Sequence, residues 1–245
     1  MLVKAKLFAL TILLICFHAD GVTMSKVKWG YAHFPPLTFK SESGDITGDL
    51  AELTKQSLLA AGVKYEAIEY PNRRIYSLLN EGKIDFGVFT RSFISNPNDF
   101  IISQFAVSQI ELRAYWVGQK TEIKTPEDLI GQRVILLSAY TYGGLRAFFN
   151  DPANKVTVVA NMEQHDRAFE ALNLGRGDYV LDYTGPSRLA LNDLTIDNLQ
   201  SSVLSKLDVY FIIHKSVNDA KAIMQSLDAH YLSTHRHSQI PPCGP

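Results

Sequence analysis

The sequence predicts an α/β protein made of two halves with the same architecture. Short apolar segments of strand character alternate with amphipathic helical segments between residues 27 and 89. The same strand–helix–strand–helix–strand order recurs between residues 132 and 183, without a visible repeat of the sequence itself. Since parallel strands joined through helices need right-handed crossovers, this alternation predicts mainly parallel sheets flanked by helices.

The best-defined unit spans residues 70–92. Ile75, Leu78 and Leu79 form one apolar stripe at helical spacing, and Gly82 stands where a helix commonly ends in the left-handed conformation. The apolar run 84–89 then reads as a buried strand. The other expected strands are 27–32, 64–70, 101–105, 111–117, 133–137, 156–159, 179–181 and 209–214, and the other expected helices are 49–61, 145–149, 163–174, 186–192 and 217–233.

The first 21 residues have the pattern of a cleavable secretory signal peptide. Lys4 and Lys6 precede the apolar run 7–17, which is too short to span a bilayer comfortably, and residues 19–21 are small or polar enough for cleavage. Cleavage is expected after residue 21, with residue 19 as the alternative. We therefore expect a soluble, periplasmic mature chain.

Composition excludes several classes of protein. The 245 residues are 46% hydrophobic and 20% charged with a formal net charge of -1, which is ordinary for a globular protein and gives no support for nucleic-acid binding. Removal of the signal peptide takes Cys16 and leaves only Cys243, so neither an internal disulfide nor a structural zinc site is expected. We expect a monomer with no cofactor and no metal.

Polar and aromatic side chains gather where the expected strands end. In open α/β sheets, ligands bind at the carboxyl ends of the strands, so two facing halves would line one cleft with these loops. Hydroxyls, aromatic rings and opposite charges suit a small zwitterion or anion. The candidate ligand-binding residues are Tyr31, Phe34, Arg73, Thr90, Arg91, Tyr140, Thr141, Tyr142, Asp182 and Tyr183.

Two of these features also have a purely structural interpretation. Arg73 and its neighbour Arg74 can be ordinary solvated cations, and the aromatic loop 33–39 can be a hydrophobic plug under the end of the sheet. If an anionic ligand binds, replacing Arg73 or Arg91 by alanine should weaken binding by about 2 kcal/mol for at least one of them. Asp85 and Asp178, at the starts of equivalent strands, are expected to hold turns.

Five segments in order resemble the extracytoplasmic solute-binding proteins of family 3, the polar amino-acid uptake family. They are GYAHFPPLTF (30–39), GDLAELTKQSLLAAGV (48–63), LLNEGKIDFGVF (78–89), TPEDLIGQRVILL (125–137) and ALNLGRGDYVLDY (171–183), and they extend over nearly the whole mature chain. The resemblance implies the two-lobed type II periplasmic-binding fold with a two-segment hinge. It implies lobe 1 at residues 22–108 and 208–245, and lobe 2 at residues 109–207.

The resemblance also implies residue roles, with two departures. A Thr and an Arg after the third strand would hold the ligand carboxylate, and Thr90 matches that Thr. The usual Arg position falls in the stretch 95–98, which is Ser-Asn-Pro-Asn here, so Arg91 or Arg73 would have to substitute. Asp182 would hold the amino group, but it lies one residue closer to Asp178 than is usual.

Three functions remain open. The first is capture of a small polar, carboxylate-bearing solute for an inner-membrane ABC permease. The second is a sensory binding module that acts in trans. The third is a lyase or dehydratase on the same fold, with His33, Asp182 or Glu111 as acid or base, although the sequence contains no Ser-His-Asp order, HExxH or P-loop.

Overall fold

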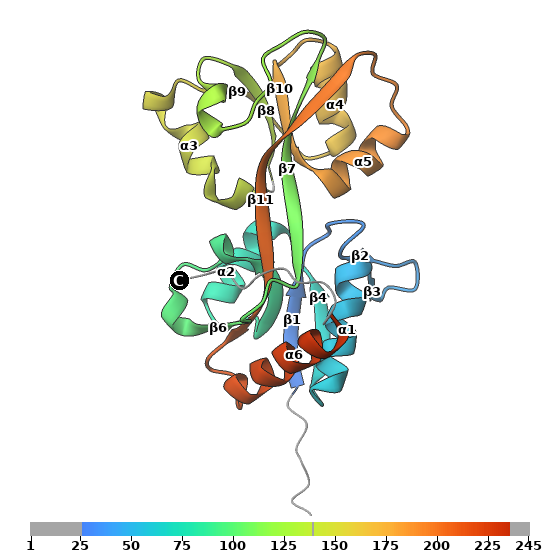
Figure 1. Ribbon diagram of the computed structural model, residues 1–245, viewed down its shortest axis with the longest axis vertical. Coiled ribbons are helices and arrows are strands. Elements are labelled where there is room, and N and C mark those ends of the chain that lie inside the picture. The colour runs from blue at the N-terminus through green and yellow to red at the C-terminus, as the bar shows by residue number, and fades with distance from the viewer. Residues whose placement is uncertain (1–25, 139, 236–245) are drawn as a thin grey trace, which may run out of the picture.

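Two lobes stand end to end and are joined by two long strands, as the computed structural model shows (Figure 1). The structure describes residues 26–138 and 140–235. The expected signal peptide, both cysteines and the end of the C-terminal tail lie outside the described residues. In the part of the chain that is described, no helix is long and apolar enough to cross a membrane.

Lobe 1 contains a sheet covered by helices on both faces. Its strands are β1 (Lys26–Tyr31), β4 (Lys64–Glu69), β5 (Phe86–Thr90) and β6 (Phe100–Ile102), and its helices are α1 (Asp49–Ala60), α2 (Asn72–Asn80) and α6 (Ala220–Thr234). Strand β1 is parallel to β4 and to β5, as crossover connections through α1 and α2 require. A two-stranded hairpin, β2 (Phe39–Lys40) with β3 (Ile46–Thr47), precedes α1, in a segment that the sequence indicated only as a loop and turn.

Lobe 2 repeats this plan with shorter helices. Its strands are β8 (Arg133–Leu137), β9 (Thr157–Met162) and β10 (Tyr179–Tyr183), and its helices are α3 (Arg146–Asn150), α4 (His165–Asn173) and α5 (Thr184–Asn192). Strand β8 lies parallel to both β9 and β10. Short 3-10 turns include η1 (Arg91–Phe93) after β5, η3 (Pro126–Leu129) before β8 and η4 (Tyr142–Gly144) after it.

Two antiparallel strands, β7 (Ser108–Val117) and β11 (Leu199–His214), pass between the lobes (Figure 1). They join all the described strands except β2 and β3 into one continuous sheet, in the order β4-β1-β5-β11-β7-β10-β8-β9 with β6 on β11. The sequence indicated two facing halves, and the pairing of β7 with β11 joins the strands of both halves in one sheet. The lobe boundaries predicted from the sequence fall at the start of β7 and within β11, and they remain a prediction.

The first half of β11 was missed because its sequence is polar. Residues 199–208 are mostly exposed or half-buried, with only Ser202 and Leu204 buried, whereas residues 209–213 of the predicted part are an unbroken buried run. Pairing with β7, and not hydrophobicity, therefore extends this strand to 16 residues.

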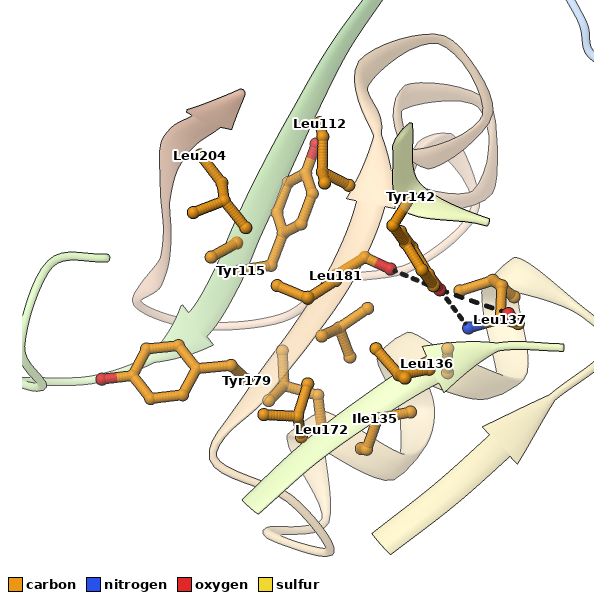
Figure 2. Packing of buried hydrophobic residues seen from close by; sticks show 14 of the residues in the cluster. Leu112, Tyr115, Ile135, Leu136, Leu137, Tyr142, Leu172, Tyr179, Leu181 and Leu204 are labelled. Carbon is orange, nitrogen blue, oxygen red and sulfur yellow. Dashed lines mark hydrogen bonds between the residues drawn. The ribbon is translucent and has the colours of Figure 1, made fainter. Parts of the chain in front are cut away.

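The alternation of β11 also explains how lobe 1 forms two cores. Phe211 packs with α1 and α6 on one face of the sheet, while Ile212 packs with Ile75 and Leu79 of α2 on the other face. This is the two-residue period of a strand that is buried on both sides. Lobe 2 has its own core around β8 and β10, drawn in Figure 2.

Equivalent aspartates hold the start of the third strand in each lobe. Asp85 accepts a hydrogen bond from the Lys28 backbone N–H at 2.8 Å. Asp178 accepts one from the Arg133 backbone N–H at 3.0 Å and also contacts the Arg133 and Lys120 side chains. Both bridge to the neighbouring strand, as the structural interpretation of these two residues expected.

Candidate functional site

A cavity of about 80 Å³ lies where the two lobes meet, and we call it the inner cavity. Lobe 1 supplies the end of β1, the loop 33–38 and the end of β5, while lobe 2 supplies the loop after β8 and the end of β10. Six of the ten predicted residues line it: Tyr31, Phe34, Thr90, Tyr140, Thr141 and Tyr183. All six follow or end a strand at its carboxyl end or lie in the loop after it, which is why one sequence rule found them together.

Three aromatic rings form one wall of the inner cavity across the lobe boundary. The ring of Phe34 packs edge-on against Tyr140 and Tyr183, with centroids 5.9 and 5.4 Å apart. Tyr140 and Tyr183 are themselves 5.0 Å apart in a T-shaped arrangement. The loop 33–39 is thus a plug, as the structural alternative held, and it is also a cavity wall.

The polar groups of the inner cavity are neutral. Thr90 and Asn72, from the start of α2, both line the cavity, and the Thr90 hydroxyl shares a hydrogen bond of 2.7 Å with the hydroxyl of Ser92. The side chain of Tyr31 is only 4% exposed, and its hydroxyl has no hydrogen-bond partner among the described residues. Burial, with the nearby charge of Glu69, raises the pKa of Tyr31, so this phenol stays protonated at neutral pH.

A second, wider space of about 800 Å³ adjoins the inner cavity, and we call it the outer cavity. Ala32, Asn72 and Tyr140 line both spaces. Four carboxylates line the outer cavity, and no lysine or arginine is among its lining residues: Glu69, Glu163, Asp166 and Asp193.

A hydrogen-bond chain runs from the core of lobe 2 to the wall shared by the cavities. Asp182 is fully buried and contacts Nδ1 of His165 at 2.7 Å, and Nε2 of His165 lies 3.3 Å from the hydroxyl of Tyr140. The other oxygen of Asp182 accepts the Tyr183 backbone N–H at 2.7 Å. Burial raises the pKa of Asp182 although His165 acts in the opposite direction. Asp182, predicted as a direct ligand contact, therefore reaches the cleft only through His165.

The two predicted arginines are not at the inner cavity. Arg73 is exposed and lines none of the described cavities. The guanidinium of Arg91 lies 4.6 Å from the centre of the Tyr210 ring, and its side chain lines a separate space of about 290 Å³ with Lys206. Thr90 borders both that space and the inner cavity, so a ligand contact from either arginine would require movement.

Tyr142 supports the site from behind. It is fully buried, and its hydroxyl accepts the Leu137 backbone N–H at 2.5 Å and faces the carbonyls of Leu137 and Leu181 (Figure 2). Its ring stacks on Tyr183 with centroids 6.2 Å apart. Where the sequence predicted a wall residue, the structure places a residue that positions the wall.

His165 and Asn72 were not among the predicted site residues. His165 begins α4 just after β9, and Asn72 begins α2 just after β4, so the strand-end rule that found the others applied to both. No group of three metal-binding side chains is present among the residues that the structure describes.

Comparison with solved structures shows the fold. Holo ArgBP from T. maritima matches with a TM-score of 0.62 and 19% identity, over 86% of this chain and 90% of that one. A histidine kinase sensor domain with similarity to periplasmic binding proteins matches with a TM-score of 0.65 and 16% identity, over 91% and 98% of the two chains. The GluR0 ligand-binding core in complex with L-glutamate gives 0.64 and 13%, over 88% and 95%.

These likenesses define the class of architecture. The chain has the type II periplasmic-binding fold, as the sequence predicted. No protein-family model and no curated protein sequence matches it. At identities this low, the fold is shared, and the chemistry must be argued from the site itself.

Proposed function

We propose that the chain is an extracytoplasmic solute-binding protein that captures a small polar solute between its lobes and delivers it to an ABC-type permease. The observation that carries this proposal is the inner cavity, because residues from both lobes line it and all lie around strand carboxyl ends. Capture between lobes requires no catalytic group, and the protein would act as a monomer in the periplasm.

The hinge supports this mode of binding. Strands β7 and β11 are paired along most of their shared length, with a register shift between Val203 and Ser205. A bulge is a place where a paired ribbon bends without losing its ladder. Closure about this hinge would bring the aromatic wall onto a ligand and remove water, which strengthens polar contacts to it.

Related folds bind amino acids, and this supports a ligand of similar size. The matched structures include an ancestral arginine-binding protein bound to arginine, an ancestral arginine-binding protein bound to glutamine, and the GluR0 core with L-glutamate. The expected carboxylate-bearing ligand, however, would meet no lysine or arginine at the wall of the inner or the outer cavity.

Two alternatives each have one supporting observation. A sensory module acting in trans is supported by the matched histidine kinase sensor domain. A lyase or dehydratase is supported by the Tyr140–His165–Asp182 chain, which could supply a positioned base. Turnover of a bound solute by the purified protein would favour the enzyme, and growth of a deletion strain on the solute would separate uptake from sensing.

A thermal-shift screen over amino acids, organic acids, amines and polyamines tests the proposal. A solute that binds only the folded protein must raise the unfolding midpoint. The variant Thr141→Trp, which fills the inner cavity, should lose that rise, while Thr195→Trp on an exposed position of lobe 2 should keep it. A rise that survives in Thr141→Trp would place the binding site elsewhere and contradict the proposal.

A further inference from the structure

We propose that the ligand is a small organic cation without a carboxylate, whose uncharged body lies against the aromatic wall and whose N–H donors face Tyr31 and the carboxylates of the outer cavity. This inference rests on the proposed function and adds the chemical class of the solute. It also replaces the anionic ligand that the sequence favoured.

The inner cavity is built without any charged side chain. Its polar lining consists of hydroxyls and one amide, and the rest is aromatic or aliphatic. Moving a carboxylate from water into such a space is unfavourable unless a cation or several N–H donors compensate it. The uncharged part of a ligand, flat or aliphatic, has no such desolvation penalty, and its contact with the rings is favourable.

The aromatic wall favours positive charge over negative charge. Phe34, Tyr140 and Tyr183 pack edge to face on one another, and the face of an aromatic ring carries negative electrostatic potential while its edge is positive. An ammonium or guanidinium that lies over an open face of this wall is attracted, and a carboxylate there is repelled.

Tyr31 supplies an independent observation that points to a donor on the ligand. Its side chain is almost fully buried, lines the inner cavity and leaves its hydroxyl without a partner among the described residues. The hydroxyl is not among the fully buried unpaired atoms, so it opens onto the cavity, where it can accept a hydrogen bond from a ligand. With Glu69 close enough to raise the pKa of this phenol, a positively charged N–H donor satisfies the hydroxyl and offsets the carboxylate at once.

The side chains that line the outer cavity also favour a cation, because they carry mainly negative charge. Glu69, Glu163, Asp166 and Asp193 form no ion pair or hydrogen bond through their side chains among the residues described, and the only basic groups on the lining are His33 and His165. The charge of Arg167 acts on Asp166 from outside the lining, and the four carboxylates around the opening attract cations and raise their local concentration, more strongly at low salt.

The competing assignment is an anion near Arg91. Arg91 and Lys206 line the separate space beside Thr90, but Arg91 stacks on Tyr210 and Lys206 pairs with Glu111 at 3.3 Å. An anion would have to break these contacts or bind outside the inner cavity. The two assignments therefore differ in both ligand charge and the residues that matter.

Matched compounds test the charge directly. Phenylalanine, 2-phenylethylamine and 3-phenylpropionate share one body, and they differ in carrying both charged groups, the amine alone or the carboxylate alone. Arginine and agmatine give a second pair that differs only by the carboxylate. By calorimetry with the full mature chain, each amine without a carboxylate should bind at least about tenfold more tightly than the carboxylate-bearing members of its series.

Variants then test the site. Tyr31→Phe and Glu69→Gln should each weaken binding of the amine by about fivefold or more, since each loses one charge-assisted contact. Glu122→Gln should not, because Glu122 is exposed and pairs with Lys124 away from the cleft. Arg73→Ala and Arg91→Ala should leave binding of the amine unchanged.

The outcomes separate this inference from the proposed function. Tighter binding of 3-phenylpropionate or phenylalanine than of 2-phenylethylamine would overturn the cation while leaving solute capture in place. Amine binding that is insensitive to both Tyr31→Phe and Glu69→Gln would also overturn it. Failure of every compound in these series and in the broad screen would overturn the proposed function with it.

Discussion

Tyr142 shows how one hydroxyl near a binding cleft can serve the fold and not the ligand. The sequence placed it with Tyr140 and Thr141, and nothing in the residue type separates the three. The structure separates them by backbone conformation, because Tyr142 has a positive φ of 54° that turns its ring inward (Figure 2). The sequence of a single loop does not show which of its residues face the hydrophobic core and which face the cleft.

Removing the Tyr142 hydroxyl should destabilise the protein without a ligand present. The variant Tyr142→Phe leaves the Leu137 backbone N–H without its acceptor inside the core, which should lower the free energy of unfolding by about 1–3 kcal/mol. Denaturant titration measures it. Tyr76→Phe, on an exposed ring of α2, is the matched control and should have almost no effect. Equal stability of Tyr142→Phe and the wild type would show that this bond carries no net stabilisation.

At the residue scale, the position of a side chain relative to the cleft could be predicted only where the backbone of a strand fixes its direction. Tyr31, Thr90 and Tyr183 end strands, so their position at the sheet edge follows from the strand itself. Arg73 lies one residue inside α2, and the helical turn directs it to solvent instead of the cleft. The sequence rule found the loop correctly, but the direction of a side chain on a helical turn depends on packing that the sequence does not display.

At the scale of elements, Asp178 couples two strands of lobe 2 through charge. Burial alone would raise the pKa of Asp178, but hydrogen bonds from Arg133 and Lys120 outweigh it and hold this pKa well below its usual range. Because the folded pKa is below the unfolded one, ionised Asp178 stabilises the native state at neutral pH. That contribution is lost as pH falls from about 4 towards the lowered pKa.

The variant Asp178→Asn should therefore lower the free energy of unfolding by about 1–3 kcal/mol at pH 7. The gap between variant and wild type should narrow as the pH is lowered from about 4 towards the lowered pKa, because the unfolded wild type takes up a proton there while the folded carboxyl is still ionised. Denaturant titrations at several pH values measure it, with the exposed Asp197→Asn as control. A gap that stays constant with pH would refute the electrostatic origin.

Gly48 joins the aromatic loop to the start of α1 through backbone contact. It has φ of 111° and ψ of 162°, a region that is essentially confined to glycine, and a Cβ there would lie 2.5 Å from the carbonyl oxygens of Pro36 and Leu37. Those same carbonyls accept the first N–H groups of α1, from Asp49 and Leu50. The helix start and the loop that carries Phe34 are therefore held as one unit.

Gly48→Ala should destabilise the protein by about 2 kcal/mol or more, since both the conformation and the contact are lost. Gly62→Ala has a positive φ but open space around the new methyl group, so it should cost only about 1 kcal/mol. Thermal unfolding of the two variants measures the difference. If the two losses are equal, the close approach of the loop to Gly48 contributes nothing.

The elements themselves were largely predictable, and the exceptions have a common cause. Strand β8 agrees with its predicted bounds, and α1 begins at residue 49 as predicted, because apolar periodicity marks both elements. The first half of β11 and the short hairpin of β2 with β3 carry no such signal, since pairing with a distant or neighbouring strand forms them. The continuous sheet was hidden for the same reason.

For the whole molecule, the arrangement of the lobes makes one cleft out of loops that are far apart in the sequence. Strands β7 and β11 set the distance and direction between the lobes (Figure 1), and the interlobe contacts of Phe34 close the space between them. Gly185 of α5 adds to this contact, because a Cβ there would lie 3.0 Å from the ring of Pro36. The cleft is thus a property of the assembled chain, and neither lobe contains it alone.

The central claim is that a ligand binds in the cleft between the two lobes. A crystal structure of the mature chain, grown with the compound that raises the unfolding midpoint most, would test this claim most directly. The account predicts that the compound lies between the lobes, with Tyr31 and Thr90 on one side of it and Tyr140 on the other. A compound bound on the outer face of one lobe, with the space between Phe34 and Tyr140 unchanged, would contradict it.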